Sequence, residues 1–396
     1  MKKPELLAPA GDLERLKMAI RYGADAVYIG GMLFGLRANA INFTLEDIKE
    51  AVSFAHSYNK KIYVTVNIVL HNKEVIKLVE YLKELDSVGV DAIIVSDPTV
   101  IELANKNTNL EIHLSTQQST LNYEAIKFYK KLGVTRIVLA RETSKEEIMD
   151  IKKNVDIEIE TFIHGAMCAG YSGRCVLSNY LTDRDANRGG CSQICRWDFD
   201  LYDDDKLLKG DKNFTFCTKD LSMLKHIPEM MEMGITSFKI EGRMRSVYYI
   251  ATIVRIYRKV IDEYWNNSST YKYNINYEKE LNNCANRDSI TQFFDNNYGK
   301  DCNYYNDRYE ASNQDFLGIV IDYQDGYATI EQRNYFKRDD IVEFFGPNLD
   351  NITFKIGEII DCDSKEVIEY VNHPKQVVKL KIDIKLNSFD MMRIKK

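Results

Sequence analysis

Five of the eight cysteines of this chain lie within residues 168–217, and none lies in the 167 residues before them. Four of them follow the pattern Cys168-x6-Cys175-x15-Cys191-x3-Cys195, and Cys217 lies a little farther on. We expect a cytoplasmic protein, because no signal-peptide pattern opens the sequence. In a reducing cytosol, such crowding favours metal or redox chemistry over disulfides.

The spacing favours an iron–sulfur cluster, with zinc and plain buried or redox thiols as alternatives. Thiolates must converge on a cluster from loops, and nearby glycines allow the backbone to wrap closely around it. A structural zinc site usually has two close cysteine pairs, and only Cys191 and Cys195 have that spacing. His164 could complete a zinc site, and Cys217 rivals Cys195 as the fourth ligand.

Arginines accompany the cysteines. Arg174 and Arg188 lie between glycines and cysteines, and the guanidinium group suits bidentate capture of carboxylate or phosphate. We predict that both bind substrate. Local ion pairing is the alternative, because aspartates such as Asp183 and Asp185 are interleaved with them.

Eight short apolar runs in the first 265 residues predict the scaffold. They are residues 5–9, 26–30, 62–67, 92–96, 111–115, 136–141, 157–164 and 237–241. Between these runs, apolar residues recur at the spacing of a helix, as in Val75, Leu78, Val79 and Leu82. This alternation predicts a TIM-like (β/α)8 barrel over residues 1–265. A doubly wound sheet is the alternative, although no Gly-x-Gly-x-x-Gly motif follows the first strand.

Polar residues follow these runs, where a TIM barrel builds its active site. They are Asn67, Asp97, Ser115, Gln117, Arg141, Glu142, His164, Lys239, Glu241 and Arg243. After the seventh run comes an insertion over residues 165–219, far longer than a usual βα loop of about two to six residues. The next helix is predicted to begin at Asp220 as its N-cap.

The remainder predicts a second domain. Residues 266–312 read as a linker with some helix. Residues 313–396 show short strand patterns separated by turn signals, which predicts a small antiparallel β-barrel. Residues 375–396 carry seven Lys or Arg against two Asp. This basic strip could face phosphate or simply protect a sheet edge.

Composition excludes several classes. Hydrophobic residues make up 45% and charged residues 28%, as in ordinary globular proteins. No apolar run is long enough for a membrane span, so we expect no membrane partner. The net charge of −6 argues against a general nucleic-acid coat. No zinc-protease, Walker or Gly-x-Ser-x-Gly motif occurs.

Four motifs resemble those of the peptidase U32 (collagenase-like) family. Residues 160–178 read ETFIHGAMCAGYSGRCVLS, residues 187–196 NRGGCSQICR, residues 239–244 KIEGRM and residues 4–11 PELLAPAG. With a barrel and a small β-domain, the chain is most similar to the tRNA 5-hydroxyuridine branch. That resemblance implies hydroxylation of the wobble uridine in the tRNA anticodon loop, with prephenate as the oxygen source.

The resemblance also implies site roles. It gives a 4Fe-4S cluster on Cys168, Cys175, Cys191 and Cys195, with Cys217 as the alternative fourth ligand. We expect His164, Glu160 and Glu241 to act as acid–base groups. We expect a tRNA phosphate or the small dicarboxylate, prephenate, to bind to a set of six residues. These are Arg174, Arg188, Lys239, Arg243, Gln117 and Asn67.

Two other functions are consistent with the resemblance. The family name implies a U32-type, collagenase-like peptidase, although no nucleophile–base pair is evident. The chain could instead be a cluster-bearing subunit, with a homologous partner subunit, of a hydroxylase acting on rRNA or a quinone precursor.

Overall fold

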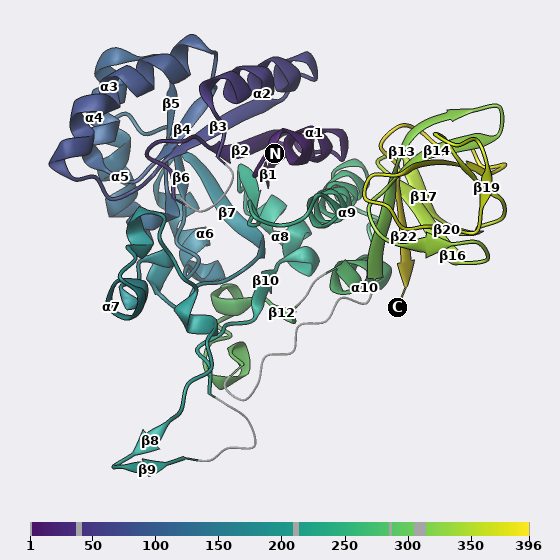
Figure 1. The fold of residues 1–396 in the computed structure, drawn as a ribbon. Coiled ribbons are helices and arrows are strands. Elements are labelled where there is room, and N and C mark those ends of the chain that lie inside the picture. Colours follow the sequence, from purple (N-terminus) through teal and green to yellow (C-terminus); the bar gives the residue numbers. More distant parts are fainter. Residues whose placement is uncertain (1, 37–41, 209–213, 285–286, 305–313, 396) are drawn as a thin grey trace. The chain divides into compact units, whose positions relative to one another are not determined.

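Within residues 2–36, 42–208, 214–284, 287–304 and 314–395, which the computed structural model describes, eight parallel strands close into a barrel (Figure 1). The last strand pairs in parallel with both the first and the seventh, which closes the sheet. The strands are β1 (Glu5–Pro9), β2 (Ala26–Gly30), β3 (Lys61–Val66), β4 (Ala92–Val95), β5 (Glu111–Leu114), β6 (Arg136–Val138), β7 (Glu158–Gly165) and β11 (Ser237–Ile240). The predicted TIM-like barrel is confirmed.

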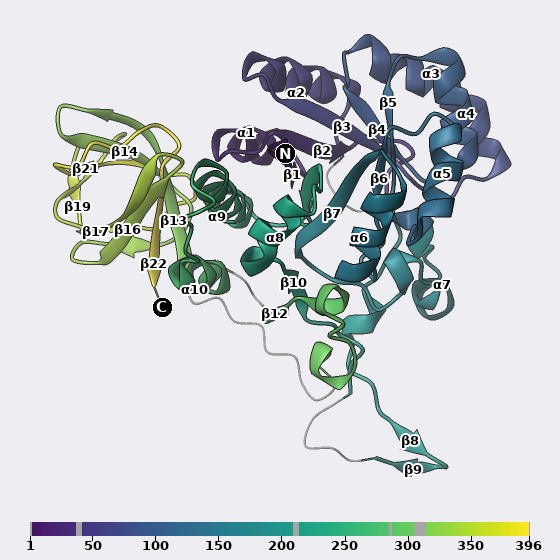
Figure 2. The same cartoon turned by 180° about the vertical axis from the view of Figure 1, so that it is seen from behind.

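Helices cover the outside of this barrel, as Figure 2 shows for α3 to α6. They are α1 (Leu13–Arg21), α2 (Leu45–Ser57), α3 (Asn72–Ser87), α4 (Pro98–Asn107), α5 (Tyr123–Lys131), α6 (Lys145–Asn154), α8 (Ile227–Glu232) and α9 (Val247–Asn266). Local signals set their starts. Ser144 and Glu147 form a capping box that begins α6, and Asp97 caps α4 before a proline.

The insertion after β7 consists of short elements. They are the 3-10 turns η2 (Tyr171–Gly173), η3 (Ala186–Arg188) and η4 (Ile194–Arg196), helix α7 (Leu177–Thr182), and the hairpin β8 (Tyr202–Asp203) and β9 (Lys206–Leu207). Strand β10 (Asp220–Ser222) then pairs antiparallel with the end of β7.

The predicted helix start at Asp220 is wrong. Asp220 begins β10, and its carboxylate lies 2.9 Å from the Arg287 guanidinium, so it does not cap a helix. After the 3-10 turn η5 (Leu224–His226), the helix begins at Ile227, with proline in its first turn. Pairing of β10 with β7 and β12, both distant in sequence, outweighs the local helix-capping preference of Asp220.

The chain divides into two compact units, Met1–Glu278 with Arg287–Glu310, and Lys279–Asn286 with Ala311–Lys396. The segment predicted as a linker with some helix contains α10 (Ile275–Cys284), β12 (Ser289–Ile290), η6 (Gln292–Asp295) and η7 (Lys300–Cys302). β12 pairs in parallel with β10. This part of the chain therefore has regular structure of its own.

The second unit is an antiparallel β-domain, as predicted. Its sheet has the order β17-β16-β22-β13-β14-β21-β18-β19, and β15 pairs with β20. The strands are β13 (Gln314–Gln324), β14 (Tyr327–Gln332), β15 (Phe336–Lys337), β16 (Ile341–Gly346), β17 (Leu349–Lys355), β18 (Ile359–Asp361), β19 (Val367–Ile368), β20 (Tyr370–Val371), β21 (Val377–Lys381) and β22 (Met391–Lys395). Phe336, Phe344 and Met392 lie in its fully buried core.

One member of the predicted basic strip is not on the surface. Arg393 is 1% exposed, and its guanidinium donates to Glu343 Oε2 at 2.6 Å and to Glu280 Oε1 at 2.9 Å. Two carboxylates compensate its charge, so Arg393 stabilises the β-domain and does not contribute to a surface for phosphate. In the described part of the chain, no helix combines the length and the apolar character that crossing a membrane requires.

Candidate functional site

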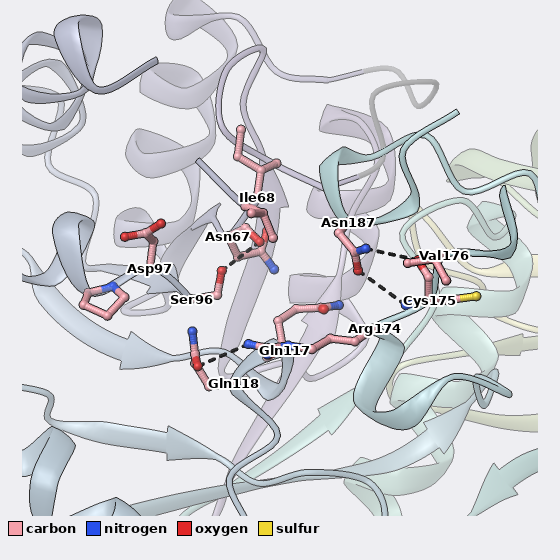
Figure 3. A pocket seen from close by; sticks show the side chains of 12 residues that line it. Asn67, Ile68, Ser96, Asp97, Gln117, Gln118, Arg174, Cys175, Val176 and Asn187 are labelled. Carbon is pink, nitrogen blue, oxygen red and sulfur yellow. Dashed lines mark hydrogen bonds between the residues drawn. The ribbon is translucent and has the colours of Figure 1, made fainter. Parts of the chain in front are cut away.

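Two hollows lie at the carboxyl end of the barrel and share Asn67 and Gln117. The outer hollow, of about 470 Å³, lies against the cysteine insertion and is shown in Figure 3. It is lined by Asn67, Ile68, Val69, Ser96, Asp97, Pro98, Gln117, Gln118, Arg174, Cys175, Val176 and Asn187. Polar residues that follow separate strands therefore meet at one site, because parallel strands end on the same face of the barrel.

The inner hollow, of about 110 Å³, is strongly cationic. Its lining residues are Tyr28, Leu36, Thr65, Asn67, Ile94, Ser115, Thr116, Gln117, Arg141, Phe162, Lys239, Glu241 and Arg243. Three of these are cations and one is an acid. Arg243 donates to Thr65 Oγ1 at 3.2 Å, and Lys239 Nζ lies 4.6 Å from the Tyr28 ring centre. The inner hollow is suited to a small anion.

Arg141 is a lining cation that the predicted substrate-binding set did not include. Its guanidinium lies 4.0 Å from the ring centre of Phe162 and donates to the Ala166 carbonyl at 3.1 Å. Its position just after β6 is the signal that could have included it. The stacking and the hydrogen bond fix the guanidinium at the wall of the inner hollow.

Glu160 lies inside the barrel and does not line either hollow. Its carboxylate is fully buried, 2.7 Å from Lys239 Nζ and 3.3 Å from Arg136 Nη1. Burial alone would raise the pKa of Glu160, but the charges of Lys239 and Arg136 outweigh it and lower the pKa. The carboxylate therefore holds Lys239, which reaches the inner hollow.

His164 is also buried away from both hollows. Its Nδ1 lies 3.3 Å from the Tyr257 hydroxyl, and the two rings meet edge to face. Burial, aided by the Arg245 charge, lowers the pKa of His164 to about 3. The imidazole is therefore neutral near pH 7. Of the three predicted acid–base groups, Glu241 is the one that lines a hollow.

The two predicted insertion arginines have different positions. Arg174 lines the outer hollow, donates from Nε to the Gln117 carbonyl and reaches Gln118 Oε1 at 3.2 Å. Arg188 is not among the lining residues. It donates to the Val69 carbonyl at 2.7 Å and pairs with Glu74 on α3, and this hydrogen bond lowers the pKa of Glu74. Arg188 fastens the insertion to the barrel.

The insertion thiols are close enough to influence one another. Burial raises the pKa of Cys168, and the charges of Cys191 and Cys175 act in the same direction. Burial and the neighbouring Cys168 raise the pKa of Cys195 to about 11, and Cys217 adds to this effect. These five thiols of the insertion are therefore linked electrostatically, and Cys175 lines the outer hollow.

Backbone amides point at several of these sulfurs. Leu177 N donates to Cys175 Sγ and Gln193 N to Cys191 Sγ, both at 3.4 Å, and the Gly170 amide lowers the pKa of Cys168. Such donors stabilise thiolates that bind a cluster. Among the described residues, no group of three or more His, Cys, Asp or Glu could hold a metal ion as placed. Cysteine thiolates with backbone amides directed at them fit an iron–sulfur cluster by their chemistry.

Cys217 differs from the other candidate ligands in its surroundings. It is 1% exposed, and its thiol donates to the Thr218 carbonyl at 3.7 Å. Arg287 Nη1 lies 4.0 Å from its sulfur. Cys195 is less buried and interacts with both Cys168 and Cys191.

Comparison with known proteins assigns the family. Residues 11–303 match the model of Peptidase family U32, and residues 312–393 match that of the Peptidase family U32 C-terminal domain. The chain belongs to peptidase family U32. The U32 family predicted from the sequence motifs is therefore confirmed.

The relatives of this U32 protein carry names for different activities. It is 51% identical over 401 residues to tRNA hydroxylation protein P1 of Bacillus subtilis, covering 99% of this chain and 95% of that protein. It is 43% identical over 258 residues to a 23S rRNA 5-hydroxycytidine synthase of Escherichia coli, covering 65% of this chain and 39% of that protein. It is 36% identical over 276 residues to a collagenase of Porphyromonas gingivalis, covering 66% of each.

Proposed function

We propose that this U32 protein hydroxylates the wobble uridine of tRNA, with a 4Fe-4S cluster and with prephenate as co-substrate. The names of two relatives, a tRNA hydroxylation protein and an rRNA hydroxycytidine synthase, support RNA hydroxylation. The observation that carries the proposal is that Cys175 lines the same hollow as the strand-end residues Asn67 and Gln117. Cluster ligands and substrate groups would then meet at one wall.

The cluster would be held by Cys168, Cys175, Cys191 and either Cys195 or Cys217. The donor set supports a cluster, because cysteine thiolates are the ligands that hold iron–sulfur clusters. Backbone amides directed at three sulfurs add to this support. When bound, the cluster supplies one-electron transfer.

The inner hollow, of about 110 Å³, would hold the carboxylate groups of the co-substrate, whose remaining atoms would extend into the adjoining outer hollow. Lys239, Arg141 and Arg243 line it and offer charged donors to two carboxylate groups. Glu160 keeps Lys239 in place from below. Glu241 is the acid that lines this hollow, so it is the group placed to move a proton at the bound substrate.

The outer hollow would receive the nucleoside. Its volume of about 470 Å³ lies within the usual range for ligand pockets, about 300–1,000 Å³. RNA bases become reachable when a loop presents them unstacked, as an anticodon loop does. Arg174, at the same hollow, would keep the cysteine-bearing turn against the barrel.

The nucleoside profile of tRNA from a strain that lacks this gene tests the function. We expect 5-hydroxyuridine to disappear and to return with the intact gene, but not with a Cys168→Ala variant. Anaerobic purification with iron and sulfide analysis tests the cluster separately. Unchanged tRNA together with cleavage of gelatin by the pure protein would establish the peptidase instead, as the name of the P. gingivalis relative suggests.

A further inference from the structure

We propose that the side-chain amide of Gln117 reads the Watson–Crick edge of the target uracil. This inference rests on the proposed function, because it names the residue that recognises the base in that site. Gln117 lines both hollows, so it lies at the junction between the proposed nucleoside site and the proposed dicarboxylate site. A base held there would lie next to the co-substrate.

The backbone of Gln117 is fixed from two sides. It lies in the 3-10 turn η1 (Thr116–Gln118), and its N–H donates to Ser115 Oγ at 3.3 Å. Its carbonyl accepts from Arg174 Nε, which belongs to the cysteine insertion. The side chain therefore starts from a rigid position, which favours specific recognition because little ordering is needed on binding.

Gly173 lies close to the Gln117 amide, and its lack of a side chain leaves space for that amide. A Cβ on Gly173 would lie 2.8 Å from Gln117 Nε2, and Gly173 has a φ of +82°, which favours glycine. With glycine at that position, the turn that leads into Cys175 lies over this amide without displacing it, and the left-handed backbone is unstrained. The close fit links the cysteine-bearing turn to the residue that we assign to the base.

The other amides of the outer hollow are already engaged within the protein. Asn187 donates to the Cys175 carbonyl at 3.0 Å, and Gln118 Oε1 accepts from Arg174 and Tyr129. Asn67 Oδ1 accepts from the Leu36 amide at 3.3 Å. In the part of the chain that the structure describes, the Gln117 amide makes no such hydrogen bond, and Figure 3 shows this side chain among the other lining residues.

The chemistry of the amide matches the base. A carboxamide offers one donor and one acceptor side by side, and the uracil edge offers N3–H beside the O4 acceptor. Paired bidentate contacts of this kind discriminate bases. Apolar side chains in the same hollow, Ile68, Pro98 and Val176, can contact the faces of a planar ring.

Binding of anticodon stem-loop RNA to the anaerobically purified full chain tests this assignment. One RNA carries uridine at the target position, and the other carries 3-methyluridine, which lacks the N3–H donor. We expect the intact protein to bind the uridine RNA about tenfold more tightly, as loss of one or two hydrogen bonds implies. In Gln117→Ala the two RNAs should bind equally.

Gln324→Ala is the matched control, because that side chain is exposed on β13 of the β-domain and lines neither hollow. It should keep the preference for uridine over 3-methyluridine. Equal binding of both RNAs by the intact protein would overturn the inference, and so would an unchanged preference in Gln117→Ala. Failure of the intact protein to bind the uridine RNA above a scrambled RNA would instead overturn the proposed function, and this inference with it.

Discussion

The Glu160 carboxylate lies 2.7 Å from Lys239 Nζ inside the barrel, and neither group is more than 5% exposed in its side chain. β7 supplies Glu160, and β11 supplies Lys239 through the pairing that closes the barrel. The same carboxylate also faces Arg136. The same ion pair therefore connects the two strands that close the barrel and holds the Lys239 cation at the inner hollow.

Glu160→Gln is expected to destabilise the protein, because it leaves buried Lys239 without its carboxylate partner, whereas Arg136 keeps Glu5 and Glu158. The cost should be about 3–5 kcal/mol of unfolding free energy, measured by chemical denaturation. Glu241→Gln should instead abolish hydroxylation with little change in stability, since Glu241 lines the hollow. If Glu160→Gln keeps full stability but loses activity, Glu160 acts as an acid–base group.

Stability should fall in acid partly because of His164. Its folded-state pKa of about 3 lies below the ordinary value of about 6.5. Between these two pH values the unfolded chain binds a proton at this histidine and the folded chain does not. The free energy of unfolding therefore decreases as the pH falls from about 6.5 toward 3. His164→Asn should reduce the slope of unfolding free energy against pH between pH 6.5 and 4. An identical slope in that variant would assign the acid sensitivity to other groups.

Iron content distinguishes the two candidate fourth ligands. Cys168→Ala, Cys175→Ala and Cys191→Ala should each lose most of the iron, and so should whichever of Cys195→Ala and Cys217→Ala removes a ligand. The buried Cys284 is the control outside the insertion, and Cys284→Ala should keep its iron. Iron retained in all three of the Cys168, Cys175 and Cys191 variants would argue against the cluster.

The sequence predicted the barrel because its strands are local apolar runs, and the polar residues after those runs do meet at one face. It could not predict the position of Glu160, since its partner Lys239 depends on how β7 and β11 pair when the barrel closes. Asp220 failed as a helix cap for the same reason. Arg393 was predicted to be a surface charge, because its partner Glu280 lies 113 residues away and no local sequence pattern indicates that pairing.

Arg141 and Arg188 differ in position, and that difference predicts that only the Arg141 variant loses affinity for the co-substrate. Arg141 lines the inner hollow, whereas Arg188 pairs with Glu74 on α3. Arg141→Ala should weaken prephenate binding about 10- to 100-fold, as loss of a charged hydrogen bond implies, measured by isothermal titration calorimetry. Arg188→Ala should leave that affinity unchanged while loosening the insertion, which raises its rate of proteolysis. Equal loss of prephenate affinity in both variants would show that the arginines act through the fold and not through contact with the dicarboxylate.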